Sequence, residues 1–210
     1  MSATESIETI LAFWFGADGS STDAPAATVS GRQSALWWGK DTAVDQTIKA
    51  RFEADLLAAA DGRHDAWAET PQGMLALILL LDQFPRNMYR DTDQAFSFDA
   101  LAQQCCHLGL AQGFDQQLAP LQRVFFYLPL EHSEDIDDQE YSVQLFRALA
   151  KQSVKEDPAC KASFDNYLKF ADQHHAIIER FGRFPHRNVI LDRPSTAEET
   201  AFLKEPHSSF

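Results

Sequence analysis

The sequence predicts an all-α protein built from antiparallel helices that are joined mostly by short loops. Apolar residues recur every three or four positions along most of the 210 residues, and no segment alternates as a strand does. The chain is 45% hydrophobic and 11% aromatic, which is enough to bury a substantial core. We therefore expect one helical domain over residues 1–210, with about eight helices in antiparallel hairpins.

The first two helices follow from their apolar spacing. Ile7, Ile10, Leu11 and Trp14 indicate a helix that ends at Gly16. Residues 16–35 are rich in Gly, Ser, Thr and Ala, so we expect them to form a surface loop. The stripe Val44, Ile48, Phe52 and Leu56 predicts the second helix, which should end at Gly62.

The third helix should be the central, buried one. Thr70 suits the N-cap and Pro71 the first helical position. The run Met74–Leu81 is apolar nearly all round, which is typical of a helix enclosed by others. We expect Pro85 to end this helix, because proline cannot donate the helical hydrogen bond.

The remaining helices are placed by their caps. A fourth helix is expected at residues 97–109, and a fifth from Pro120. Ser133 is the expected N-cap of the sixth helix, and Asp157-Pro158 should begin the seventh. Ser195 and Glu198 have the spacing of a capping box for a last short helix.

Composition and charge exclude several classes of protein. The net charge of −13 disfavours nucleic acid as a partner. The longest apolar run has eight residues, whereas a membrane span needs about 20. The first basic residue is Arg32, so no signal peptide is visible, and the three cysteines (Cys105, Cys106 and Cys160) form no C-x-x-C pair. We expect a cytoplasmic protein; its oligomeric state is not indicated.

Two related motifs carry the polar residues of greatest interest. They read "DQFPRN" at 82–87 and "RFGRFPHRN" at 180–188. In both, a Phe-Pro break should stop a helix and be followed by Arg and Asn, and Gly182 can take the left-handed conformation of a helix end. A carboxylate at Asp82 lies near the negative end of a helix and calls for a cation, which Arg86, Arg183 or Arg187 can supply.

These motifs have two interpretations. They are clasps between helix ends, or they form a site that holds an anion, since Arg binds carboxylate and phosphate through two parallel hydrogen bonds. The candidate ligand-binding residues are Arg86, Asn87, His174, Arg183, Arg187 and Asn188.

The segment "PLEHSEDIDDQ" at 129–139 suggests acid–base chemistry. A histidine beside carboxylates can act as a general base, with Glu131 or Asp135 orienting His132, and His186 is an alternative base. The structural alternative is that these acids stabilise the first turn of a helix. His174 lies on an apolar helix face, where a satisfied core histidine is the ordinary interpretation.

The sequence leaves metal and cofactor use undetermined. His132, His174 and His186 would suffice for a transition-metal site with Glu131 or Asp135 if the fold brought them together. No phosphate-binding G-x-x-x-x-G-K-[ST], no G-x-G-x-x-G and no G-x-S-x-G is present, which disfavours nucleotide-fold enzymes and α/β-hydrolases.

Four motifs together resemble the bacterial domain-of-unknown-function family 924. They are "ILAFWFG", "LALILLLDQFPRNMYR", "FFYLPLEHSED" and "RFGRFPHRN", and the likeness extends from Ile10 to Phe202 with "STAEETAFL" near its end. The resemblance implies a tetratricopeptide-repeat-like all-α fold, although this chain lacks a clear 34-residue repeat consensus. The family has no settled activity. Its motif positions present here are Asp82, Arg86, Asn87, Glu131, His132, Ser133, Glu134, Asp135, His174, Arg183, His186, Arg187 and Asn188.

Three functional hypotheses follow. The first is a soluble helical binding protein that captures a small anionic molecule or a carboxylate-bearing peptide end. The second is a hydrolase-type enzyme, with or without a metal, that uses the His, Glu and Asp residues named above. The third is a structural or protein-interaction scaffold in which every motif is a clasp.

Overall fold

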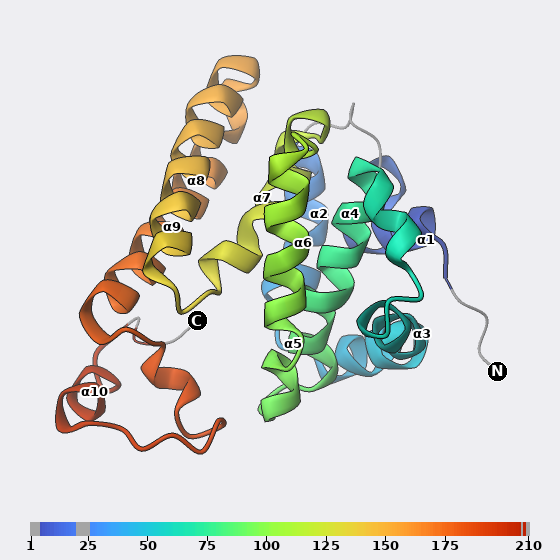
Figure 1. Ribbon diagram of the computed structural model, residues 1–210. Coiled ribbons are helices and arrows are strands. Elements are labelled where there is room, and N and C mark those ends of the chain that lie inside the picture. Colours follow the sequence, from blue (N-terminus) through green and yellow to red (C-terminus); the bar gives the residue numbers. More distant parts are fainter. Residues whose placement is uncertain (1–4, 20–25, 207, 209–210) are drawn as a thin grey trace.

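A computed structural model describes residues 5–19, 26–206 and 208. Within these residues the chain forms helices and turns with no strand, so the prediction of an all-α fold is confirmed (Figure 1). The α-helices are α1 (Ile7–Gly19), α2 (Ala26–Trp38), α3 (Thr42–Ala60), α4 (Pro71–Ile78), α5 (Phe84–Met88), α6 (Asp99–Ala111), α7 (Pro120–Glu131), α8 (Ile136–Glu156), α9 (Lys161–Phe181) and α10 (Ala197–Phe202).

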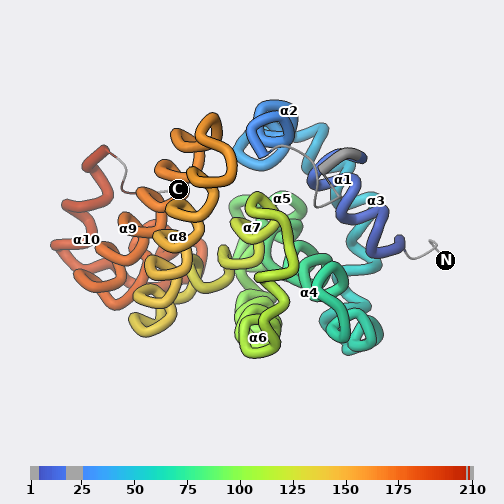
Figure 2. The backbone as a smooth tube through the Cα atoms, turned by 90° about the horizontal axis from the view of Figure 1, so that it is seen from above, coloured from blue at the N-terminus to red at the C-terminus, as the bar shows by residue number. Residues whose placement is uncertain are grey.

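The helices follow one another in a curved row. Seen from above, α1 and α3 lie at one end, α6 and α7 in the middle, and the α8–α9 hairpin with α10 at the other end (Figure 2). The hairpin packs against α7. The chain after α9 therefore has to turn back toward the middle of the row to reach α6 (Figure 1).

Helix α4 is enclosed by other helices, as predicted for the buried helix. Thr70 caps it by accepting a hydrogen bond from the Gly73 N–H, and Pro71 occupies its first turn. Every side chain from Met74 to Ile78 is buried. The core continues into a cluster of aromatic rings around Phe84, whose centroid lies 5.3 Å from that of Trp14 and 4.8 Å from that of Phe52.

Helix α2 corrects the predicted surface loop at residues 16–35. Residues 20–25 lie outside the described part of the chain, but residues 26–35 are helical. Gly16 has a φ of 78° and interrupts α1, and Gln33 on α2 donates hydrogen bonds to the carbonyls of Phe13 and Trp14. The buried side chains of Val29 and Trp37 add packing, so tertiary contacts outweigh the weak helix propensity of this segment.

Pro85 does not end the helical path, which is a second correction. A π-helical turn at Leu79–Gln83 joins α4 to α5, and the Phe84 N–H bonds the carbonyl five residues back. A proline in a regular α-helix clashes with the carbonyl four residues earlier. The wider turn accommodates the ring, so the helical path continues to Met88.

Two predicted caps are displaced. The N-cap of α8 is Asp135, which accepts from the Asp137 N–H, whereas Ser133 accepts from the Asp135 N–H in the preceding turn. The capping box of α10 pairs Thr196 with Glu199, and the Ser195 hydroxyl instead accepts a hydrogen bond from Asn188. The left-handed end of α9 at Gly182, with a φ of 67°, is confirmed.

Within the described residues, no helix is long and apolar enough to cross a membrane. The tetratricopeptide-repeat-like arrangement, the single-domain organisation and the cytoplasmic location stay predictions.

Two glycine-to-alanine substitutions test the packing with opposite expected signs. A Cβ at Gly109 on α6 would lie 2.4 Å from Phe126 Cζ and 3.0 Å from Met74 Cγ, both in the core. Gly109→Ala should therefore lower the free energy of unfolding by about 1–3 kcal/mol. Gly31→Ala on α2 meets no atom within 4 Å and should raise it by about 0.5–1 kcal/mol. Urea titration measures both, and a destabilising Gly31→Ala would contradict a helical α2.

Candidate functional site

A buried carboxylate is the centre of a polar cluster between the middle of the row and the C-terminal segment, which is the chain after α9 (residues 182–206). The cluster consists of Asp82, Arg86, Asp99, His132 and Arg187. Asp82 lies in the π-helical turn with 0% of its surface exposed. Its Oδ1 is 2.8 Å from His132 Nδ1 and 3.4 Å from Arg86 Nη2, and Gln83 Nε2 donates to Oδ2. Burial alone would raise the pKa of Asp82, but Arg86 and His132 outweigh it and hold that pKa well below the usual range.

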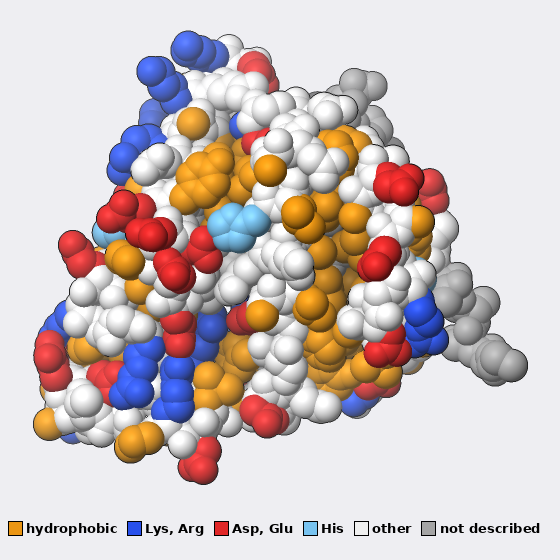
Figure 3. Space-filling view, viewed as in Figure 1, with side chains coloured by type: hydrophobic (Ala, Val, Ile, Leu, Met, Phe, Trp, Pro, Cys, Tyr) orange, Lys and Arg blue, Asp and Glu red, His pale blue; other side chains and the backbone are white. Residues whose placement is uncertain are grey.

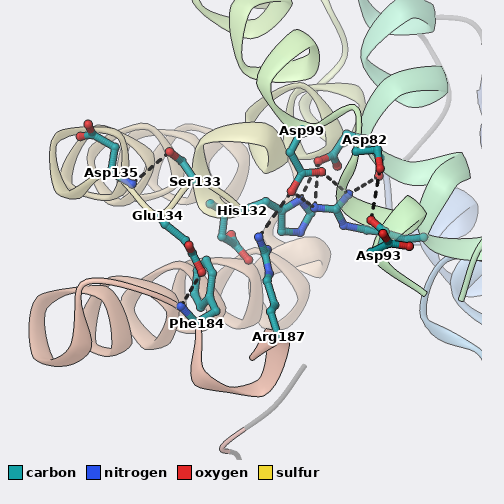
Figure 4. Close-up of polar contacts among 12 residues, drawn as sticks. Asp82, Asp93, Asp99, His132, Ser133, Glu134, Asp135, Phe184 and Arg187 are labelled. Carbon is teal, nitrogen blue, oxygen red and sulfur yellow. Dashed lines mark hydrogen bonds and ion pairs between the residues drawn. The ribbon is translucent and has the colours of Figure 1, made fainter. Parts of the chain in front are cut away.

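The arginines of the two Phe-Pro motifs meet at one carboxylate, Asp99, at the start of α6. Arg86 donates from Nη1 and Nη2 to the two Asp99 oxygens at 3.0 and 3.2 Å. Arg187, more than a hundred residues along the chain, donates from Nη1 to Asp99 Oδ2 at 3.4 Å. Figure 4 shows Arg187 extending from the C-terminal segment toward Asp99, with His132 beside it.

Arg187 is buried and incompletely hydrogen-bonded. Its guanidinium carbon lies 4.7 Å from the ring centre of Phe96 and 4.5 Å from that of Phe184. Its Nε is buried and has no hydrogen-bond partner among the described residues. Burial and the neighbouring Arg86 lower the pKa of Arg187 to about 10, so it stays charged at neutral pH.

His132 is held in one tautomer. An ionised Asp82 can only accept a hydrogen bond, so His132 Nδ1 carries the proton and Nε2 keeps its lone pair. Burial and the nearby Arg86 lower the pKa of His132, which leaves the ring neutral at pH 7. Its side chain is 15% exposed, so the histidine reaches the surface while its aspartate does not.

A second pair lies behind this one. Glu131 Oε1 is 3.2 Å from His174 Nδ1, which also donates to the Phe170 carbonyl at 2.9 Å. Burial and Asp82 raise the pKa of Glu131 to about 8, and burial lowers the pKa of His174 well below its ordinary value. At pH 7 this contact therefore joins a protonated carboxyl group and a neutral ring, rather than two charges.

The structure brings five of the predicted site residues into the cluster or against it: Arg86, Glu131, His132, His174 and Arg187. His186 lies at its edge, with its ring centre 5.6 Å from that of Phe184, and burial lowers its pKa to about 4. Asp135 is an exposed helix cap, so it does not orient His132 as predicted.

The other three predicted residues have structural contacts elsewhere. Asn87 donates to Asp45 Oδ1 at 2.8 Å, on α3. Arg183 makes a two-bond pair with Glu199, at 2.6 and 2.8 Å. Asn188 donates to Ser195 and Glu199 and is fully buried, so it holds the C-terminal segment together.

No metal site is formed by the described residues: no group of three or more His, Cys, Asp or Glu among them is arranged to hold an ion. The described structure therefore does not bring His132, His174 and His186 together in the arrangement that a transition-metal site requires. A cavity of about 150 Å3 lined by Pro120, Cys160, Phe164 and other residues contains no member of the cluster.

Sequence reasoning missed Asp99 and the two phenylalanines that contact Arg187. Asp99 stands in the first turn of a helix, where an acid has an ordinary stabilising use, so nothing in the sequence marks it as a partner of two arginines. Phe96 and Phe184 look like core residues. The one signal in the sequence was the occurrence of Arg86 and Arg187 in similar motifs, which suggested that the two arginines converge.

The fold and the cluster define an all-α helical protein in which Asp82, His132, Arg86 and Arg187 form a polar cluster between the middle of the row and the C-terminal segment. The chain belongs to the family described as bacterial protein of unknown function (DUF924), whose model matches residues 10–207, as the sequence motifs indicated. The structure of a protein of unknown function from Agrobacterium tumefaciens is similar, with 39% identity and a TM-score of 0.72, over 89% of this chain and 100% of that one. A comparison with curated proteins gives no match.

The raised pKa of Glu131 gives a testable pH dependence. Between its unfolded pKa, near 4.5, and about 8, the folded state keeps a proton that the unfolded state releases, so this group lowers stability as pH rises. Glu131→Gln should mimic the protonated form. The variant should match the wild type at pH 5 and exceed its unfolding free energy by a few kcal/mol at pH 9. Urea titrations at both pH values measure this, and equal pH slopes would contradict a buried, protonated Glu131.

Proposed function

We propose that the protein binds a small carboxylate-bearing ligand at Arg187, with Arg86 and His132 beside it. The supporting observation is the unused edge of the Arg187 guanidinium. Only Nη1 bonds a described residue, at the long distance of 3.4 Å, while Nε is buried without a described hydrogen-bond partner. A buried donor left unpaired is costly, about 1–3 kcal/mol, and a ligand oxygen would remove that cost.

The geometry of arginine favours a carboxylate as the ligand. Nε and one Nη form a fork whose spacing fits the two oxygens of a carboxylate. The rings of Phe96 and Phe184 pack against the guanidinium, 4.7 and 4.5 Å from its carbon, so we expect a ligand to approach the edge of the group. A planar carboxylate fits such an edge better than a tetrahedral phosphate does, because all of its oxygens can accept hydrogen bonds within the guanidinium plane.

The alternative of a purely structural clasp accounts for Arg86 better than for Arg187. Arg86 donates three hydrogen bonds, two to the oxygens of Asp99 and one to the Asp82 carbonyl at 2.6 Å. Arg183 is also a clasp, paired with Glu199. A purely structural clasp does not explain Arg187, because its buried Nε has no hydrogen-bond partner among the described residues. A free small molecule and the C-terminal end of a peptide both carry the required carboxylate. The net charge of −13 disfavours nucleic acid as the partner.

Thermal unfolding with succinate as the probe tests this proposal. A ligand that binds only the folded state raises the melting temperature with concentration. Succinate at constant ionic strength should raise the melting temperature of the wild type. Acetate, with one carboxylate and few other contacts, should raise the melting temperature less. Arg187→Lys keeps the charge but loses the fork, so it should abolish the shift.

Arg183→Lys is the matched control, since Arg183 belongs to the same motif and lies outside the cluster. It should lower the melting temperature of the unliganded protein slightly and keep the full succinate shift. Equal succinate shifts in Arg187→Lys and the wild type, or none in either, would exclude Arg187 as the ligand-binding residue.

A further inference from the structure

We infer that the same site hydrolyses a carboxylate-bearing ester, with His132 as the general base and Asp82 as the residue that positions it. This inference rests on the proposed function, because Arg187 is what brings an anionic substrate to His132. It changes the sequence prediction in one respect: neither Glu131 nor Asp135 orients His132, and Asp82 takes that role.

The first argument is the polarity of the Asp82–His132 pair. A fully buried, ionised carboxylate 2.8 Å from Nδ1 fixes the proton on that nitrogen. The lone pair of Nε2 is then available, and no described residue donates a hydrogen bond to it. An aspartate that orients a histidine in this way also stabilises the imidazolium that forms when the base takes a proton.

The second argument is the backbone that carries the aspartate. A helix as apolar as α4 has no structural need for a carboxylate, yet the π-helical turn at Leu79–Gln83 holds Asp82 in the core. Single π turns are uncommon and occur frequently at functional sites. The turn presents Asp82 to α7, where His132 directly follows the last helical residue, Glu131.

The third argument is the charge around His132. The titratable groups around it are Asp82 on the π-helical turn, Arg86 on α5, His174 on α9, and His186 and Arg187 on the turn Pro185–Arg187. Burial, and after it the charge of Arg86 and Arg187, lowers the pKa of His132 and keeps the ring neutral, which is the form a general base requires. The two guanidiniums also provide positive charge next to the position where an oxyanion would develop.

The reaction balances without a metal or an oxidant. His132 Nε2 removes a proton from water as the water oxygen forms a bond to the ester carbonyl carbon. The tetrahedral oxyanion then collapses, the bond to the alcohol oxygen breaks, and the imidazolium returns its proton to the leaving alkoxide. The products are a carboxylic acid and an alcohol, and His132 is regenerated as the neutral base.

The experiment compares two chromogenic esters, 4-nitrophenyl hemisuccinate and the neutral 4-nitrophenyl acetate. The wild type should hydrolyse the anionic ester with the higher kcat/KM. His132→Gln should lower kcat about 100-fold or more with little change in KM. Arg187→Lys should mainly raise KM. His107→Gln is the matched control, because His107 forms a comparable surface pair with Asp138 at 2.8 Å and should change neither constant.

Two further measurements separate catalysis from structural damage. Imidazole added to His132→Ala should restore part of kcat, which a misfolded variant would not show. Asp82→Asn removes a negative charge from the histidine, so it should lower kcat and also move the acid limb of the pH profile to lower pH. A merely structural role for Asp82 would leave the position of that limb unchanged.

The outcomes distinguish this inference from the proposed function. Succinate binding without hydrolysis of the hemisuccinate ester would overturn catalysis and leave carboxylate binding in place. Unchanged kcat in His132→Gln would overturn the role of His132. If succinate does not bind and the ester is not hydrolysed, both proposals fall together. Hydrolysis of both esters at equal rates would overturn the assigned substrate class.

Discussion

The buried carboxylate of Asp82 is the constraint around which the middle of the molecule is organised. A carboxylate buried in the core must be stabilised by cations and hydrogen bonds, because its hydration is lost. Arg86 provides an ion pair from the next helical turn, and His132, 50 residues along the chain, provides a hydrogen bond. The end of α7 is thereby fixed against the π-helical turn, and the loop into α8 starts from that fixed point.

The fold could be predicted largely because helix signals in this chain are local. The caps at Thr70 and Gly182 and the apolar run of α4 were all readable from neighbouring residues. Helix α2 was not, since its stability comes from Gln33 and Trp37 bonding carbonyls of α1. The end predicted at Pro85 was wrong for a different reason. A proline usually ends a helix, and no residue pattern indicates the π-helical turn that accommodates this one.

The site was predictable only in part because its residues meet through tertiary contacts. Motif similarity suggested that Arg86 and Arg187 belong together, and they do share Asp99. Which acid faces His132 depends on how two helices are placed relative to each other. The sequence favoured the acids nearest to His132, Glu131 and Asp135, whereas the acid that contacts its ring nitrogen is the distant Asp82. Sequence distance is a poor guide to electrostatic partners once helices pack side by side.

The C-terminal segment is joined to the rest of the molecule mainly by polar bonds. Arg193 pairs with Glu134, whose carboxylate also accepts the Phe184 N–H, and a small apolar cluster around Phe184 packs beside these bonds. Such a segment opens more readily than the α4 core and exchanges its amide hydrogens sooner. Because Arg187 belongs to this segment, each opening would move the arginine away from Asp99 and release a ligand bound to it. The lifetime of a bound molecule would then be governed by local unfolding of the segment, and it would shorten as salt weakens the Glu134–Arg193 pair.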